Sequence, residues 1–329
     1  MLPLTSEEGA SVVRQALTDV GLHRAVLDRL ETGVYIVDRS RRILYWNSGA
    51  EKITGYLSQD VAGHFCHGDL MMHCDAMGAG LCGDGCPLLS VMVDGKVREC
   101  NVFLRHRHGQ RLPVHVSAWA ILDPAGEIIG ALEVFDEVKT NGPGEAEVLE
   151  AHGCRDGMTE VAARRYGEMK LAHALEALNT FGIPFGWLRV ELDGLEEMEH
   201  RFGHGMVDAA ARMVASTLEG NVSRVDLVSC WGRGEFRIEV HSCSPQRLAE
   251  LAERLAVLVR VSNVEWWGDP IRATVSIGGG MAELNDTPES LEARVEAVFV
   301  NCRAGGGNRA AVTHFVGIEP APRSSMEAR

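Results

Sequence analysis

A stretch near the middle of the chain divides it into two parts. Residues 138–155 combine Asn141-Gly142-Pro143-Gly144 with several charges, a composition typical of a linker. Before it, residues 31–137 contain several short strand patterns, and after it, residues 156–316 alternate between helix and strand patterns. We therefore predict two compact α+β domains, preceded by a helical segment at 1–30 and followed by a disordered tail at 317–329.

The chain is acidic, because 46 Asp and Glu against 32 Lys and Arg give a net charge of -14. Such a chain is a poor candidate for binding nucleic acid or an anionic membrane. No apolar run approaches the ~20 residues of a membrane-spanning helix, and residues 1–6 do not resemble a signal peptide. We expect a cytoplasmic protein with neither nucleic acid nor membrane as partner, whose nine cysteines are mostly reduced.

The first domain is expected to be one curved antiparallel sheet with short helices. Turn residues such as His108-Gly109 separate its strand patterns. A helix pattern at 10–31 precedes them, and a loop rich in Gly, Cys and His follows the second strand. The expected strands cover 34–38, 42–46, 97–106, 111–121 and 128–136.

The stretch from Thr32 to Tyr56, TGVYIVDRSRRILYWNSGAEKITGY, resembles the beginning of a PAS domain. His108–Ser117 and Gly126–Asp136 are similar to the last two strands of that family. The resemblance implies a sensor fold of five antiparallel strands and short helices, with a ligand cavity between them.

The loop at 61–86 carries a candidate metal site. Thiolates and an imidazole are preferred ligands of zinc, and four of them complete a tetrahedral structural site. Two other interpretations stay open, namely a reversible disulfide between the last two cysteines and cysteines that simply pack as small buried side chains. The candidate ligands follow C-x6-H-x8-C-x3-C and are Cys66, His73, Cys82 and Cys86, with His64, His67 and Cys74 as substitutes.

The second domain resembles the diguanylate cyclase family, also called GGDEF, in five blocks over 156–316. The resemblance implies a palm fold with a central sheet flanked by helices, and a site that joins two GTP molecules into cyclic di-GMP with two Mg²⁺ ions. The blocks are Asp156–Tyr166, Arg189–Asp208, Cys230–Phe236, Thr274–Gly278 and Cys302–Arg309.

The family signature is altered here to Gly232-Arg233-Gly234-Glu235-Phe236. By resemblance Glu191 occupies the first metal-binding position and keeps a carboxylate for Mg²⁺, while Gly234 occupies the second and offers no ligand. Glu235 follows directly, but successive side chains of a strand point to opposite faces. We therefore expect that Glu235 does not replace the missing ligand.

The nucleotide contacts implied by the resemblance are altered in part. Asp208 is kept for guanine, Glu199 replaces the Asn of the family, and Arg303 replaces its phosphate-binding Lys. The family's phosphate-binding Arg corresponds to Gly307, and its inhibitory R-x-x-D site to Ser223–Asp226, where the Arg is displaced by one position. Gly194 and Leu195 are the remaining candidate nucleotide contacts.

These features predict a homodimeric signalling protein whose PAS sensor controls a cyclase-like domain with little or no activity. Its output would be the binding of GTP, cyclic di-GMP or a protein partner. Two alternatives stay open. The first is an active diguanylate cyclase that uses Glu191 and Glu235, and the second is a dimerisation module that binds no nucleotide.

Overall fold

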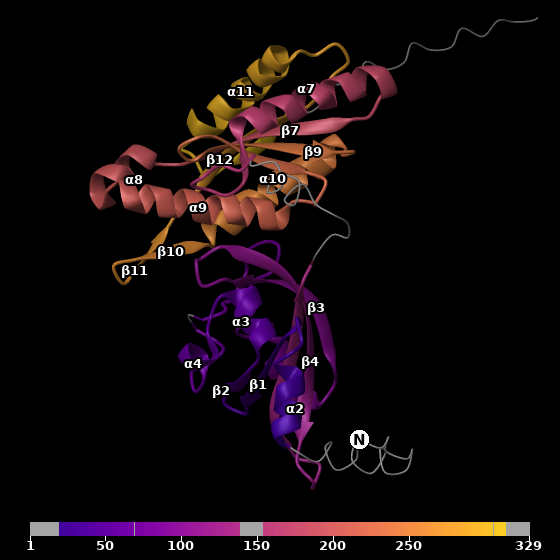
Figure 1. Ribbon diagram of the computed structural model, residues 1–329, viewed down its shortest axis with the longest axis vertical. Coiled ribbons are helices and arrows are strands. Elements are labelled where there is room, and N and C mark those ends of the chain that lie inside the picture. Colours follow the sequence, from indigo (N-terminus) through magenta and orange to yellow (C-terminus); the bar gives the residue numbers. More distant parts are fainter. Residues whose placement is uncertain (1–19, 69, 139–153, 305, 314–329) are drawn as a thin grey trace, which may run out of the picture.

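The computed structural model describes residues 20–68, 70–138, 154–304 and 306–313, which form two domains stacked end to end (Figure 1). Helix α2 (Val20–Leu27) accounts for part of the expected helix at 10–31. The rest of the N-terminal segment before residue 20, most of the predicted linker and the predicted tail lie outside the described residues.

The first domain is a five-stranded antiparallel sheet, as the sequence predicts. The strand order in the structure is β2-β1-β5-β4-β3. Short helices pack against it, and its core includes the touching rings of Tyr35, Trp46 and Phe135. Its strands are β1 (Gly33–Asp38), β2 (Ile43–Trp46), β3 (Arg98–Arg105), β4 (Arg111–Leu122) and β5 (Ile128–Glu137), and its helices after α2 are α3 (Ser48–Thr54), α4 (Ser58–Val61) and α5 (Pro87–Asp94).

Asn47 ties this domain together at the point where β2 ends and α3 begins. Its side-chain oxygen accepts hydrogen bonds of 2.8 Å from the backbone N–H groups of Ala50 and Val34. Its amide donates to the carbonyl oxygen of Thr32 at 3.0 Å. Because the side chain is fully buried, it both caps α3 and fixes that helix against β1.

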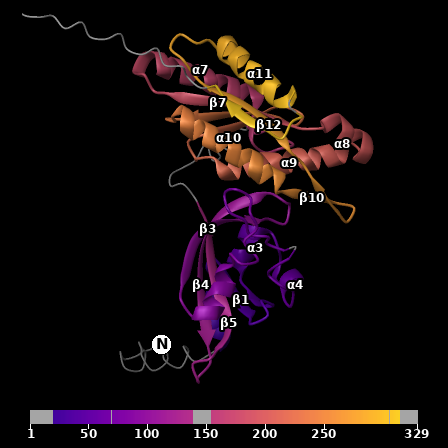
Figure 2. The same cartoon turned by 180° about the vertical axis from the view of Figure 1, so that it is seen from behind.

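The second domain contains a six-stranded sheet in the order β13-β12-β7-β9-β8-β6. Helices α9 and α10 cover the face toward the first domain, and α7 and α11 cover the other (Figures 1 and 2). The strands are β6 (Ala162–Ala163), β7 (Phe185–Leu192), β8 (Leu227–Gly232), β9 (Glu235–His241), β12 (Val275–Met281) and β13 (Ala310–Val312), and the helices are α7 (Arg164–Phe181), α8 (Leu195–Phe202), α9 (His204–Asn221), α10 (Pro245–Arg260) and α11 (Pro288–Ala304). None of the helices in the described ranges is long and apolar enough to cross a membrane.

Three local details of this domain differ from the predicted elements. The sequence pattern over 158–178 predicts one helix, but α7 begins only at Arg164, because the Asp156 side chain accepts bonds from the N–H and hydroxyl of Thr159 and closes a turn first. The pattern over 195–218 also predicts mostly helix, and the structure interrupts it at Gly203, whose φ of 83° lies outside the helical region. An unpredicted two-stranded ribbon, β10 (Asn263–Trp266) and β11 (Asp269–Arg272), follows α10.

The turn between β3 and β4 joins the two domains by resting on α9, α10 and β10 (Figures 1 and 2). Arg111, at the start of β4, is only 2% exposed, and its Nη2 donates to the carbonyl oxygen of Val261 at 2.9 Å. In return, the buried Asn221 at the end of α9 donates to the carbonyl oxygen of Arg111 at 2.9 Å. Arg105 adds a bond of 3.2 Å to Asn263 on β10.

We expect Arg111→Met to lower the free energy of unfolding by about 1–3 kcal/mol, because buried carbonyl groups on both sides of the domain contact lose their donor. Urea unfolding of the full chain measures the change. Arg98→Met is the matched control, since Arg98 forms a partly exposed pair with Asp94 that is worth under ~1 kcal/mol. Equal effects of the two substitutions would contradict the prediction.

Candidate functional site

A cleft of about 410 Å³ lies at the carboxyl end of β7, beside the β8–β9 turn and the start of α8. It brings together the residues that the sequence assigns to metal and phosphate binding. Phe236, the last residue of the signature, lies instead in the hydrophobic core and is 0% exposed. The residues predicted from the sequence that line the cleft are Glu191, Gly194, Leu195, Arg233, Gly234, Glu235 and Arg303.

Glu191 and Glu235 are direct neighbours across strands β7 and β9, so their side chains lie on the same face of the sheet. Both pair with Nη2 of Arg189, which is 3.3 Å from Glu235 Oε1. The expectation that Glu235 points away from the metal position is therefore wrong. The tight turn at Gly234, where φ is 75°, precedes the first residue of β9 and sets which face Glu235 occupies.

The two carboxylates are already neutralised by arginines. Arg303 Nη1 lies 3.0 Å from Glu191 Oε2, and Arg237 Nη1 lies 3.0 Å from Glu235 Oε1. A divalent cation would have to displace guanidinium groups from both acids before it could bind. Together with the absence of a side chain at Gly234, this arrangement does not fit a pair of Mg²⁺ ions.

Arg189 and Arg237 were not identified from the sequence. They are neighbours in the register of β7 and β9 and extend the ion pairs to Glu292 and Glu296 on α11. Their sequence signal is a charged residue between two apolar neighbours of a strand. Such a residue needs a buried partner, and the sequence does not show which one.

Gly234 is packed as a glycine. A Cβ at this position would lie 3.0 Å from Leu192 Cβ and 3.0 Å from Leu195 Cδ1, and φ is in the left-handed region. A carboxylate side chain here would therefore require both leucines to shift. The missing ligand is thus accompanied by neighbours that close around the gap.

Gly307, which replaces the phosphate-binding Arg, lies against Asp193 in a similar way. A Cβ there would be 2.8 Å from Asp193 Oδ1. Asp193 accepts hydrogen bonds from the hydroxyls of Thr274 at 2.8 Å and Ser276 at 2.6 Å. The backbone N–H of Asn308 donates to it at 2.8 Å. Asp193 therefore fixes the loop after α11 to the end of β7 and is not free to bind a ligand.

Arg233 projects from the β8–β9 turn toward the two residues predicted to recognise guanine. Its Nη1 donates to Glu199 and its Nε to Asp208 Oδ1 at 3.3 Å. Its Nη2 donates to the backbone oxygen of His204 at 3.0 Å. The hydrogen bond from Arg233 lowers the pKa of Glu199, which keeps the carboxylate ionised.

Asp226, the acid of the predicted inhibitory window, accepts hydrogen bonds from backbone groups. It is 6% exposed, and its two oxygens accept bonds of 2.9 Å from the N–H groups of Ser223 and His241. Burial raises its pKa. Its oxygens thus stabilise the chain between α9 and β8, and they leave little capacity for a nucleotide.

Family models match both parts of the chain. The model described as "Diguanylate cyclase, GGDEF domain" matches residues 154–309, and the model described as "PAS fold" matches residues 27–140. This chain carries a PAS domain followed by a GGDEF domain. Both families and their order agree with the sequence analysis, and the mixed α+β fold is confirmed.

The curated relatives of this PAS–GGDEF chain include diguanylate cyclases. The probable diguanylate cyclase DgcE of Escherichia coli is 24% identical over 306 residues, covering 92% of this chain and 27% of DgcE. The response regulator PleD of Caulobacter vibrioides is 28% identical over 156 residues, covering 46% of this chain and 34% of PleD. The chain therefore spans only about a quarter to a third of these relatives.

Solved structures similar to part of this chain include one diguanylate cyclase and one GGDEF domain with its coiled coil. SiaD of Pseudomonas aeruginosa, solved in complex with its activator SiaC, is 20% identical with a TM-score of 0.49 and covers 51% of this chain and 64% of SiaD. The coiled coil and GGDEF domain of DgcB from Caulobacter crescentus, in complex with c-di-GMP, are 20% identical with a TM-score of 0.48 and cover 51% of this chain and 90% of that one.

The cysteine-rich loop of the PAS domain contains buried thiols and a buried imidazole. Cys66 and Cys86 are each 5% exposed, and burial raises the pKa of Cys66. Burial and the nearby Arg111 lower the pKa of His73 to about 4. Across the described ranges, no three His, Cys, Asp or Glu side chains are grouped so that they could hold a metal ion. Zinc at Cys66, His73, Cys82 and Cys86 stays a prediction, which elemental analysis of protein purified without added metal would check.

Glu133 is a buried acid in the PAS sheet, opposite Tyr35 on β1. It is 1% exposed, and the Tyr35 hydroxyl donates to one of its oxygens at 2.9 Å. The other oxygen has no hydrogen-bond partner among the residues that the structure describes. Burial therefore raises the pKa of Glu133 to about 8.

We expect the PAS domain to lose stability as pH rises, because a raised folded-state pKa favours the protonated acid. The contribution is complete below the ordinary pKa of 4.5 and disappears as pH passes about 8, at up to about 1.4 kcal/mol per pH unit. Glu133→Gln should remove this component of the slope in urea unfolding between pH 5 and 8. Glu99→Gln, at an exposed position on β3, should not. Parallel slopes for wild type and Glu133→Gln would rule the effect out.

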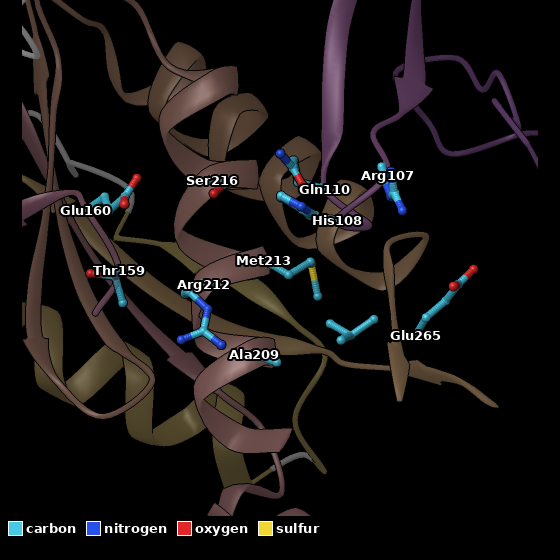
Figure 3. Close-up of a pocket in the computed structure, with 11 residues that line it drawn as sticks. Arg107, His108, Gln110, Thr159, Glu160, Ala209, Arg212, Met213, Ser216 and Glu265 are labelled. Carbon is cyan, nitrogen blue, oxygen red and sulfur yellow. The ribbon is translucent and has the colours of Figure 1, made fainter. Parts of the chain in front are cut away.

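A cavity of about 490 Å³ lies between the domains (Figure 3). It shares no lining residue with the cleft beside Glu191. Arg107, His108 and Gln110 of the PAS turn face Arg212 and Met213 of α9 across it. The side chain of Met213 points from α9 into the space between them (Figure 3). The domain contact is therefore incomplete on this side, although Arg111 closes it nearby.

Proposed function

We propose that this chain is a signal-transduction protein whose PAS sensor controls a GGDEF domain that has little or no cyclase activity and acts by binding. One observation carries the proposal. Gly234 provides no metal ligand at the signature, and its neighbours Leu192 and Leu195 close around the position. The remaining acids, Glu191 and Glu235, are paired with arginines.

The reaction that joins two GTP molecules depends on cations. These cations hold the phosphates and stabilise the negative charge on the reacting oxygens. Losing one preorganised electrostatic group of this kind costs about 3–4 kcal/mol of transition-state stabilisation. This site has no metal-binding side chain at Gly234 and no cationic side chain at Gly307. The carboxylate of Glu191 forms an ion pair with Arg303. We therefore derive no metal-dependent step from these residues.

The output would then be the binding of GTP, cyclic di-GMP or a protein partner, in a homodimer. The relatives support such outputs, because SiaD is solved with its activator SiaC and the DgcB domain with c-di-GMP. The direct contact of the PAS domain with α9 and β10 supports control by the sensor.

We expect purified protein to form no cyclic di-GMP above background when it is incubated with GTP and Mg²⁺ or Mn²⁺. Liquid chromatography with mass spectrometry measures the product. Glu191→Gln is the control, because any trace of product that persists in this variant does not come from the cleft. Cyclic di-GMP formed at an ordinary rate by the wild type, and lost in Glu191→Gln, would overturn the proposal.

One observation favours a second function, that of an active diguanylate cyclase. Glu191 and Glu235 face each other across strands and line the same cleft, so they could form an alternative acidic pair once Arg189 and Arg303 were displaced. That function requires activity that disappears in both Glu191→Gln and Glu235→Gln. Activity that survives either substitution excludes it.

A further inference from the structure

The hydrogen-bond acceptors around Arg233 form a binding site for a planar group of N–H donors. Glu199 lies on α8 and Asp208 on α9, and the guanidinium of Arg233 bonds to both. A third donor reaches the His204 carbonyl oxygen at 3.0 Å. Acceptors from two helices therefore converge on one flat group of N–H donors. The cleft that continues from Arg233 ends at Arg303, a cation suited to a phosphate.

Guanine presents the same donor pattern as this arginine. Its N1–H and its exocyclic amino group are attached to one carbon, as two N–H groups of a guanidinium are. Carboxylates accept such pairs of donors, whereas the Watson–Crick edge of adenine alternates a donor with an acceptor. A base that entered between Glu199 and Asp208 would need the same oxygens that Arg233 occupies.

The charge balance ties Arg233 to Glu199. Two ionised carboxylates facing an uncharged base need compensating charge. Arg233 pairs with both of them, and His204 Nδ1 also contacts Glu199. The contact is also placed so that it can open. Arg233 lies at the tip of a two-residue turn between β8 and β9, and its side chain is 32% exposed. It can leave without disturbing either strand.

We propose that Arg233 acts as an internal substitute for guanine, which closes the base pocket and must be displaced before a guanine nucleotide binds. The inference rests on the proposed function only in placing a nucleotide site at this cleft. It assigns to Arg233 the control of both affinity and base selectivity. Arg233 replaces a glycine of the family signature. Its side chain therefore determines whether the base pocket is open or closed.

Calorimetric titration of the full-length protein with GTP and with ATP, in the same Mg²⁺ buffer, tests the proposal. We expect the wild type to bind GTP weakly and without preference over ATP. Arg233→Gly should raise the affinity for GTP about tenfold and leave that for ATP unchanged. The double variant Glu199→Asn/Arg233→Gly should bind GTP more tightly still, because it also removes one uncompensated negative charge near a polyphosphate.

Arg201→Ala is the matched control. Arg201 is an exposed arginine on α8 that stacks on Phe202, so its removal changes the local charge equally without freeing Glu199. Arg233→Gln, which keeps a side chain of similar length, should act in the same direction as Arg233→Gly. It provides the answer if the glycine variant does not fold.

Unchanged or weaker GTP binding in the folded Arg233 variants would overturn the inference, as would an equal gain for ATP or an equal gain in Arg201→Ala. These outcomes are independent of turnover. Synthesis of cyclic di-GMP by the wild type would refute the proposed function and leave the binding result to be judged separately. An Arg233→Gly variant that gains no preference for GTP over ATP would refute the closed pocket and leave the proposed function intact.

Discussion

The second domain is organised around two arginines in the middle of its sheet. Arg189 and Arg237 are neighbours on β7 and β9, and both lie under α11. Buried guanidinium groups in a central sheet are tolerated only when carboxylates surround them. The chain supplies these from the two strands and from α11, so one charge network joins the sheet to its outer helix. The same network takes up the acids that a cyclase site would need free.

The cleft beside Glu191 differs from the metal site expected for the family at several positions, and its neighbouring side chains fit these differences. At each of three positions that differ from the family pattern, a neighbouring side chain uses the space or the charge. Leucines close around Gly234, Asp193 lies against Gly307, and Arg303 pairs with Glu191. A recently damaged site would leave unpaired carboxylates or gaps. The packing around Gly234 and Gly307 thus agrees with the proposal that this domain acts by binding.

Sequence patterns predict the elements whose signals are local. The strands of the PAS sheet follow from alternation and turn residues, and Asn47 marks the start of α3. The β10–β11 ribbon was missed because its two strands have only four residues each, too few for a clear alternating pattern, although Val264 reaches the core. Arg233 and Glu199 are 34 residues apart in the sequence. Their contact depends on the tertiary fold, so no local sequence pattern predicts it. The face of Glu235 depends likewise on the turn before it.

Helix α9 contacts both Arg233 of the β8–β9 turn and the PAS domain. Asp208 in its second turn contacts Arg233, and Asn221 at its end bonds to the PAS domain. A continuous helix of 18 residues behaves as a stiff rod of roughly 27 Å. Whatever tilts it at one end displaces the other. Thermodynamic linkage is reciprocal. If the ligand of the sensor changes the affinity of the GGDEF domain for a nucleotide, the nucleotide must change the affinity of the sensor for its ligand by the same factor.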